Sequence, residues 1–80
     1  MTRILVTSEQ VGAVFDEMER RISIDVREGY IEAQDIPEYR KAMLQGVYGT
    51  LMAISANWPD VVRMMDVEEE NRGYWKEVRK

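Results

Sequence analysis

Four small residues recur at helical spacing in the most hydrophobic segment of this 80-residue chain: Ala42, Gly46, Gly49 and Ala53. Their spacing places them in one strip along a helix. A glycine inside a helix lowers helix stability by about 1 kcal/mol relative to alanine. Two glycines in one strip are therefore typical of a helix that another helix approaches closely.

Two arrangements could use this strip. It could seat another helix of the same chain, or it could be the contact of a symmetric dimer in which this helix crosses its own copy. A domain of 80 residues buries only about 60% of the surface of its unfolded chain, so it often depends on an additional source of stability. Because the chain has no cysteine, a disulfide cannot supply it. We therefore expect self-association through Ala42, Gly46, Gly49 and Ala53, as a homodimer.

Three short polar residues occupy positions that can cap the first turn of a helix: Thr7, Asp35 and Asn57. Gln10 follows Thr7 at the spacing of a capping box, and a proline follows each of the other two in the first helical turn. These signals predict three helices, over residues 8–32, 36–56 and 58–72.

The first predicted helix has a charged side and, opposite it, one apolar stripe that consists of Val11, Val14, Phe15, Met18, Ile22, Val26 and Ala33. Within it, residues 22–26 alternate between apolar and polar and are rich in β-branched side chains, which would also suit a short strand. The helical stripe continues through this segment, so we expect a helix there. Residues 3–6 form either an extended arm or a short strand.

The predicted fold is all-α, with residues 1–80 as a single domain. The helix over 36–56 has one broad apolar face, made of Tyr39, Met43, Val47, Leu51 and Ile54. We expect it to pack antiparallel to the first helix as a long hairpin, followed by the shorter third helix and a tail over 73–80.

The acidic residues gather near the C-terminal end of the chain. Five acidic residues and one basic residue lie between positions 60 and 70, which accounts for the whole net charge of −4. Two aromatic residues follow, and they either fold back onto the chain's own core or face a partner. We expect these features to form a docking surface for a basic protein partner, made of Asp66, Glu68, Glu69, Glu70, Tyr74 and Trp75.

Composition argues against catalysis. The chain has no cysteine and no histidine, which removes thiolate and imidazole nucleophiles, bases and metal ligands. The segment from Gly46 to Gly49 lies in a helical pattern, so it is not a phosphate-binding loop. The consecutive glutamates at 68–70 diverge by about 100° per residue, so they cannot converge on one ion or substrate. We expect no enzyme, no cofactor and no metal site.

The expected function is a non-enzymatic, self-associating protein-binding module that acts as an adaptor or inhibitor of a larger cytosolic protein, including one that processes nucleic acids. The alternative is a small dimeric DNA-binding regulator, although the arginines of the first helix alternate with acidic residues, so we do not expect nucleic acid to be a partner. A third class, a ligand-binding helical dimer, rests on Met43, Met52, Met64, Met65 and Tyr48. No apolar run reaches membrane-spanning length, so we expect a cytoplasmic protein without membrane contact.

Overall fold

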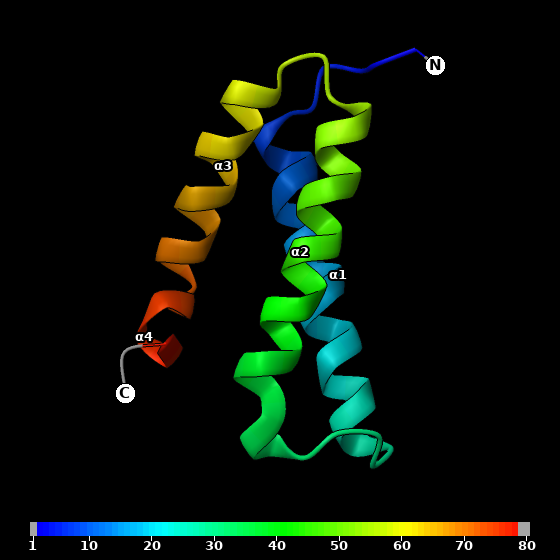
Figure 1. The fold of residues 1–80 in the computed structure, drawn as a ribbon, viewed down its shortest axis with the longest axis vertical. Coiled ribbons are helices and arrows are strands. Elements are labelled where there is room, and N and C mark those ends of the chain that lie inside the picture. The colour runs from blue at the N-terminus through cyan, green and yellow to red at the C-terminus, as the bar shows by residue number, and fades with distance from the viewer. Residues whose placement is uncertain (1, 79–80) are drawn as a thin grey trace.

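The computed structural model describes residues 2–78, and the helices in this range are α1 (Ser8–Arg27), α2 (Ile36–Ile54), α3 (Trp58–Asn71) and α4 (Tyr74–Val78). A short 3₁₀ turn, η1 (Ala33–Asp35), leads into α2. Figure 1 shows α1 and α2 side by side as a long antiparallel pair, with α3 returning along them. The predicted all-α fold, with a long helix pair and a shorter C-terminal helix, is confirmed.

The start of α1 follows the predicted capping chemistry. The Thr7 hydroxyl accepts from the backbone N–H of Gln10 at 3.2 Å, and the Gln10 side chain accepts from the backbone N–H of Thr7 at 2.9 Å. The helix ends at Arg27, earlier than the predicted residue 32. The reason is Gly29, whose φ of 81° turns the chain out of the helix. Residues 22–26 are helical, and the strand alternative for them is excluded.

Asp35 and Asn57 occupy the N-cap positions of α2 and α3, as predicted, but the side-chain caps predicted there do not form. Neither side chain makes a cap hydrogen bond. Asp35 ends the 3₁₀ turn with φ −90° and ψ −3°, and an N-cap residue normally has an extended backbone instead. The Asn57 side chain accepts from the Val6 N–H and donates to the Val6 carbonyl, both at 2.9 Å.

This contact ties the N-terminal segment to the start of α3. Ile4 adds two backbone hydrogen bonds, donating to Ile54 at 2.8 Å and accepting from Ala56 at 2.7 Å. Within residues 2–78 the segment forms one isolated parallel bridge, between Ile4 and Ser55, and no strand. Of the two alternatives left open by the sequence, residues 3–6 therefore form the extended arm.

The C-terminal boundaries differ from the prediction by a few residues. α2 and α3 end at Ile54 and Asn71, close to the predicted 56 and 72. Gly73, with φ 74°, follows α3 at the position where a glycine commonly ends a helix. The tail that we expected after it contains the short helix α4, which the sequence analysis missed because one helical turn is too short to show a periodic pattern.

The core lies mainly between α1 and α3. Most of the buried apolar side chains belong to these two helices: Val11, Phe15, Met18, Ile22, Val61 and Met65. Among the apolar residues of α2, only Leu51 is buried, and the others are half-buried or exposed. α3 packs more closely on α1 than on α2. As a result α2 keeps an open outward face and an open groove along each flank.

Candidate interaction surfaces

The outward face of α2 carries the predicted strip. Ala42, Gly46, Gly49 and Ala53 are all exposed to solvent. A Cβ atom added at Gly46 or Gly49 would meet no other atom within 4 Å beyond the helix's own neighbouring backbone. Within residues 2–78, no other segment of the chain therefore covers the strip, and the intrachain alternative finds no support.

The chemistry of this face is unusual for a helix surface. No charged residue occurs anywhere from position 42 to position 59. Met52 lies beside the strip and is 52% exposed. The outward side of a helix on a globular domain is normally charged or polar, which makes an uncharged outward face a candidate contact surface.

A first groove separates α1 from α2 and has a volume of about 610 Å³. Its lining is mostly apolar: Val14, Met18, Met43, Val47, Leu51 and Ile54. Gly46 and Thr50 also line it from α2, and Glu17 and Arg21 line it from α1. Since Gly46 belongs to both, the groove is continuous with the strip on the outward face.

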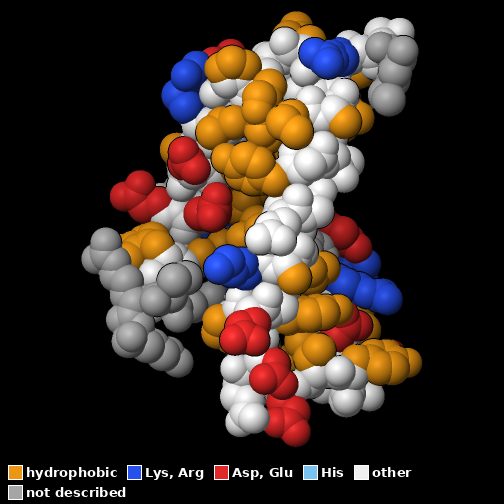
Figure 2. Space-filling model, in the orientation of Figure 1, with side chains coloured by type: hydrophobic (Ala, Val, Ile, Leu, Met, Phe, Trp, Pro, Cys, Tyr) orange, Lys and Arg blue, Asp and Glu red, His pale blue; other side chains and the backbone are white. Residues whose placement is uncertain are grey.

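A second groove, which we call the trough, separates α2 from α3 and α4. It consists of two adjoining hollows of about 480 and 430 Å³ that share Lys41, Leu44 and Glu69. One hollow reaches Tyr48 and Gly49, and the other is lined by Pro37, Arg40, Tyr74 and Trp75. Figure 2 shows hydrophobic side chains gathered between α3 and α2, with acidic side chains along the α3 side.

Glu69 is the acidic side chain that lines both hollows of the trough. Partial burial raises its pKa, and the nearby charge of Asp66 raises it further. Burial also raises the pKa of the Tyr48 phenol, with smaller contributions from the charges of Asp66 and Glu69. Among the described side chains, no Lys or Arg forms an ion pair with Glu69. The trough therefore combines largely apolar walls with a half-buried carboxylate, Glu69, that has no ion-pair partner among the described side chains.

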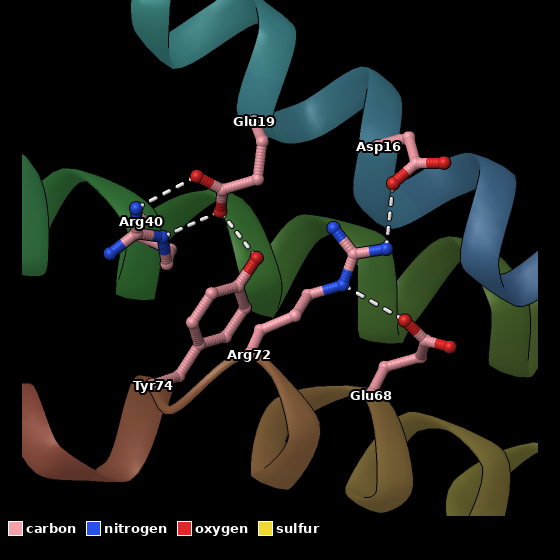
Figure 3. A network of polar contacts seen from close by, with 6 residues as sticks. All are labelled: Asp16, Glu19, Arg40, Glu68, Arg72 and Tyr74. Carbon is pink, nitrogen blue, oxygen red and sulfur yellow. Dashed lines mark hydrogen bonds and ion pairs between the residues drawn. The ribbon is translucent and has the colours of Figure 1, made fainter.

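The side of the trough facing the core is closed by a polar network (Figure 3). Glu19 of α1 accepts two hydrogen bonds from Arg40 of α2, at 2.7 and 2.8 Å, and another from the Tyr74 hydroxyl of α4. The Arg40 guanidinium also lies over the Tyr74 ring, 4.6 Å from its centroid. Burial of Glu19 opposes its charge, but the hydrogen bonds from Arg40 and Tyr74 outweigh burial and lower its pKa.

A second arginine extends this network to α3. Arg72 donates to Glu68 at 2.8 Å and to Asp16 at 2.7 Å, and its guanidinium lies 5.6 Å from the Phe15 ring centroid. Burial acts to lower the pKa of Arg72, yet its hydrogen bonds to Asp16 and Glu68 raise it above its ordinary value. These contacts hold the end of α3 against α1, so the network stabilises the position of α4.

The network explains why the predicted partner surface is not continuous. Tyr74 is only 7% exposed, its ring stacks on Phe15 with 6.1 Å between centroids, and its hydroxyl is used by Glu19. Glu68 is turned toward α1 by Arg72. Tyr74 and Glu68 thus make contacts within the chain's own fold. Of the other four residues of the predicted partner surface, Glu69 is half-buried and three are exposed: Asp66, Glu70 and Trp75.

Sequence reasoning missed the arginines of this network, although one signal was available. Arg40 lies in the middle of the apolar face of α2, between Tyr39 and Met43, where a charged residue normally requires a buried partner. The identity of that partner, Glu19, depends on how α1 and α2 pack and has no sequence signature.

The Tyr74 hydroxyl is held as a hydrogen-bond donor to Glu19. Burial and the hydrogen bond to Glu19 raise the pKa of Tyr74, so its hydroxyl stays a neutral donor at physiological pH. In the described part of the chain, no three acidic side chains converge as metal ligands would. None of the helices there combines the length and the apolar character of a membrane span.

Comparisons with protein-family models, with curated proteins and with solved structures gave no match to this chain.

Proposed function

We propose that this chain is a non-enzymatic protein-binding module that self-associates through the outward face of α2. In this role it would act as an adaptor or inhibitor of a larger cytosolic protein. One observation carries the proposal: Gly46 and Gly49 lie on an exposed, uncharged helix face and have open space around them. The absence of cysteine fits a reducing compartment.

No contact within the described fold requires a glycine at position 46 or 49. Each weakens α2 by about 1 kcal/mol relative to alanine, and an alanine would fit at either position. A second copy of α2 crossing at this point gives them a purpose, because the absence of side chains lets the two backbones approach closely. Such a contact is symmetric, since the same strip faces itself across a twofold axis.

A dimer of this kind also covers apolar surface that the single chain exposes. Met52 lies beside the strip, and the groove between α1 and α2 opens onto it at Gly46. Burying this surface on association is favourable, by about 25 cal/mol for each Å² removed from water.

The DNA-binding alternative gains no comparable support. Arg20 forms an ion pair with Glu17, and the Arg21 Nε lies 3.7 Å from a carboxylate oxygen of Asp25. These arginines are therefore already partly neutralised by carboxylates of the same helix, which reduces what α1 can offer to phosphate groups.

A leucine at position 46 tests the self-association. Because Gly46 faces open space, Gly46→Leu should fold normally and block the close approach of a second α2. Ala13→Leu, at an exposed position of α1, makes a comparable addition away from the strip and should leave association unchanged. Circular dichroism checks folding, and sedimentation velocity measures association. The proposal fails if Gly46→Leu folds and associates as strongly as the unmodified chain.

A further inference from the structure

We infer that the trough between α2 and α3 docks an amphipathic helix of the partner protein, with a Lys or Arg of that helix paired to Glu69. The inference rests on the proposed protein-binding function, because it names the chemistry of the partner. It does not require self-association, since the strip on α2 and the trough are different surfaces that meet only at Gly49.

The shape of the trough fits a helix. Its two hollows adjoin between α2 and α3, where they share Lys41 and Leu44 of α2 and Glu69 of α3. The walls are largely apolar, with Leu44 and Tyr48 on α2 and Trp75 on α4. An amphipathic helix laid between α2 and α3 would pack its apolar face against these side chains, as helices commonly occupy grooves between other helices.

The charge of the trough determines what the helix must carry. Glu69 is half-buried, lines both hollows and has no ion pair among the described side chains. Asp66 lies close enough to raise its pKa further. A cation from a partner would offset both the desolvation of Glu69 and its repulsion by Asp66, because a pair of opposite charges is favoured where water is partly excluded.

Lys41 determines which side of the trough the cation occupies. It lines the trough from α2, whereas Glu69 lines it from α3. A partner cation is therefore repelled from the α2 wall and attracted to the α3 wall. Two other polar side chains of the trough, Arg40 and Tyr74, already hydrogen bond to Glu19.

The fold itself does not explain Glu69. A carboxylate whose pKa is raised by burial destabilises the folded state at neutral pH, because its charged form is disfavoured there relative to the unfolded chain. Neighbouring Glu68, by contrast, forms an ion pair with Arg72 at 2.8 Å. Glu69 is thus the acidic residue of this segment whose position serves a ligand better than it serves the fold.

Selection from a display library of random helical peptides, using the full chain as bait, tests this inference. Peptides enriched on the unmodified chain should carry a Lys or Arg at one fixed position, with apolar residues at i−4 and i+3 from it. On Glu69→Lys the same selection should instead enrich an acidic residue at that position. Glu70→Lys, which reverses an exposed charge at the next position, should keep the original preference for a cation.

A synthetic copy of the best peptide then gives the size of the effect by fluorescence anisotropy. Glu69→Gln should weaken its binding about tenfold or more, as expected when a charge-assisted hydrogen bond is lost. Glu70→Gln should change binding by about twofold or less, as for an exposed ion pair. The inference is overturned if no peptide is enriched, if the enriched peptides lack a common cation, or if the two glutamine variants bind equally.

Light scattering of the chain without peptide separates this inference from the proposed dimer. If the chain dimerises but enriches no basic peptide, only the docking of a partner helix in the trough is refuted. A monomeric chain that binds the basic peptide refutes only the contact through α2. If Glu69→Lys abolishes dimerisation of the chain alone, the trough holds a second copy and the inferred partner helix is wrong.

Discussion

Replacing both Gly46 and Gly49 by alanine should strengthen folding and weaken association. A Cβ atom at either position meets nothing within 4 Å in the single chain, so the alanines fit without rearrangement. The gain in helix propensity is about 0.8–1.0 kcal/mol at each site, or about 2 kcal/mol together. For a domain of this size, each kcal/mol raises the melting temperature by about 4–8 °C.

The effect on association has the opposite sign. In a dimer that crosses at these glycines, two added methyl groups on each copy hold the helices apart, and the close backbone contact is lost. Urea denaturation at low concentration measures the gain in unfolding free energy, and sedimentation equilibrium at higher concentration measures the dissociation constant.

The matched control for the double variant is Ala13→Gly. It should lower the unfolding free energy by about 1 kcal/mol and leave association unchanged, because position 13 is exposed on α1. Stabilisation of the double variant with undiminished association would show that the glycines are not a contact between copies. Destabilisation would show that another part of the same chain covers the outward face of α2.

Four further changes test the network, the arm and the trough. Tyr74→Phe removes the hydroxyl bond to Glu19 but keeps the stacked ring, so the unfolding free energy in urea should fall by about 1 kcal/mol. Because the pKa of Glu19 is lowered, the stability that Glu19 adds should be lost as pH falls below its ordinary pKa of 4.5. In urea titrations across that pH range, the unfolding free energy of Glu19→Gln should therefore fall less steeply than that of the unmodified chain. The pKa of Glu69 is raised, so its charged form lowers stability, and Glu69→Gln should be at least as stable as the unmodified chain at neutral pH. This difference in stability should vanish as pH falls through the raised pKa of Glu69. Asn57→Ala should lower stability by about 1–3 kcal/mol and speed hydrogen exchange at the Val6 amide, which loses its acceptor; an unchanged exchange rate would contradict the role given to Asn57.

Local sequence signals predicted most of the helical framework. Thr7 with Gln10 marks the start of α1, because capping involves residues close in sequence. The end of α1 was predicted too late because the apolar stripe was followed past Gly29, whose positive φ ends the helix. Asn57 was misread because its side chain is used by Val6, a residue 51 positions away in sequence.

The candidate surfaces were less predictable than the helices. Spacing alone placed Gly46 and Gly49 in one strip, but whether another helix covers the strip depends on how α3 packs against α1 and α2. Likewise, consecutive glutamates on α3 have different environments. Glu68 faces Arg72 and α1, while Glu69 lines the trough, and this difference follows from the packing of α3 rather than from composition.

The most direct test of self-association through α2 is sedimentation equilibrium of the unmodified chain over a wide concentration range. A dimer contact predicts a mass that rises with concentration from the 9.4 kDa of one chain toward the mass of two. A mass that stays at 9.4 kDa up to about millimolar concentration, where even a weak contact of about −4 kcal/mol would be populated, would contradict it.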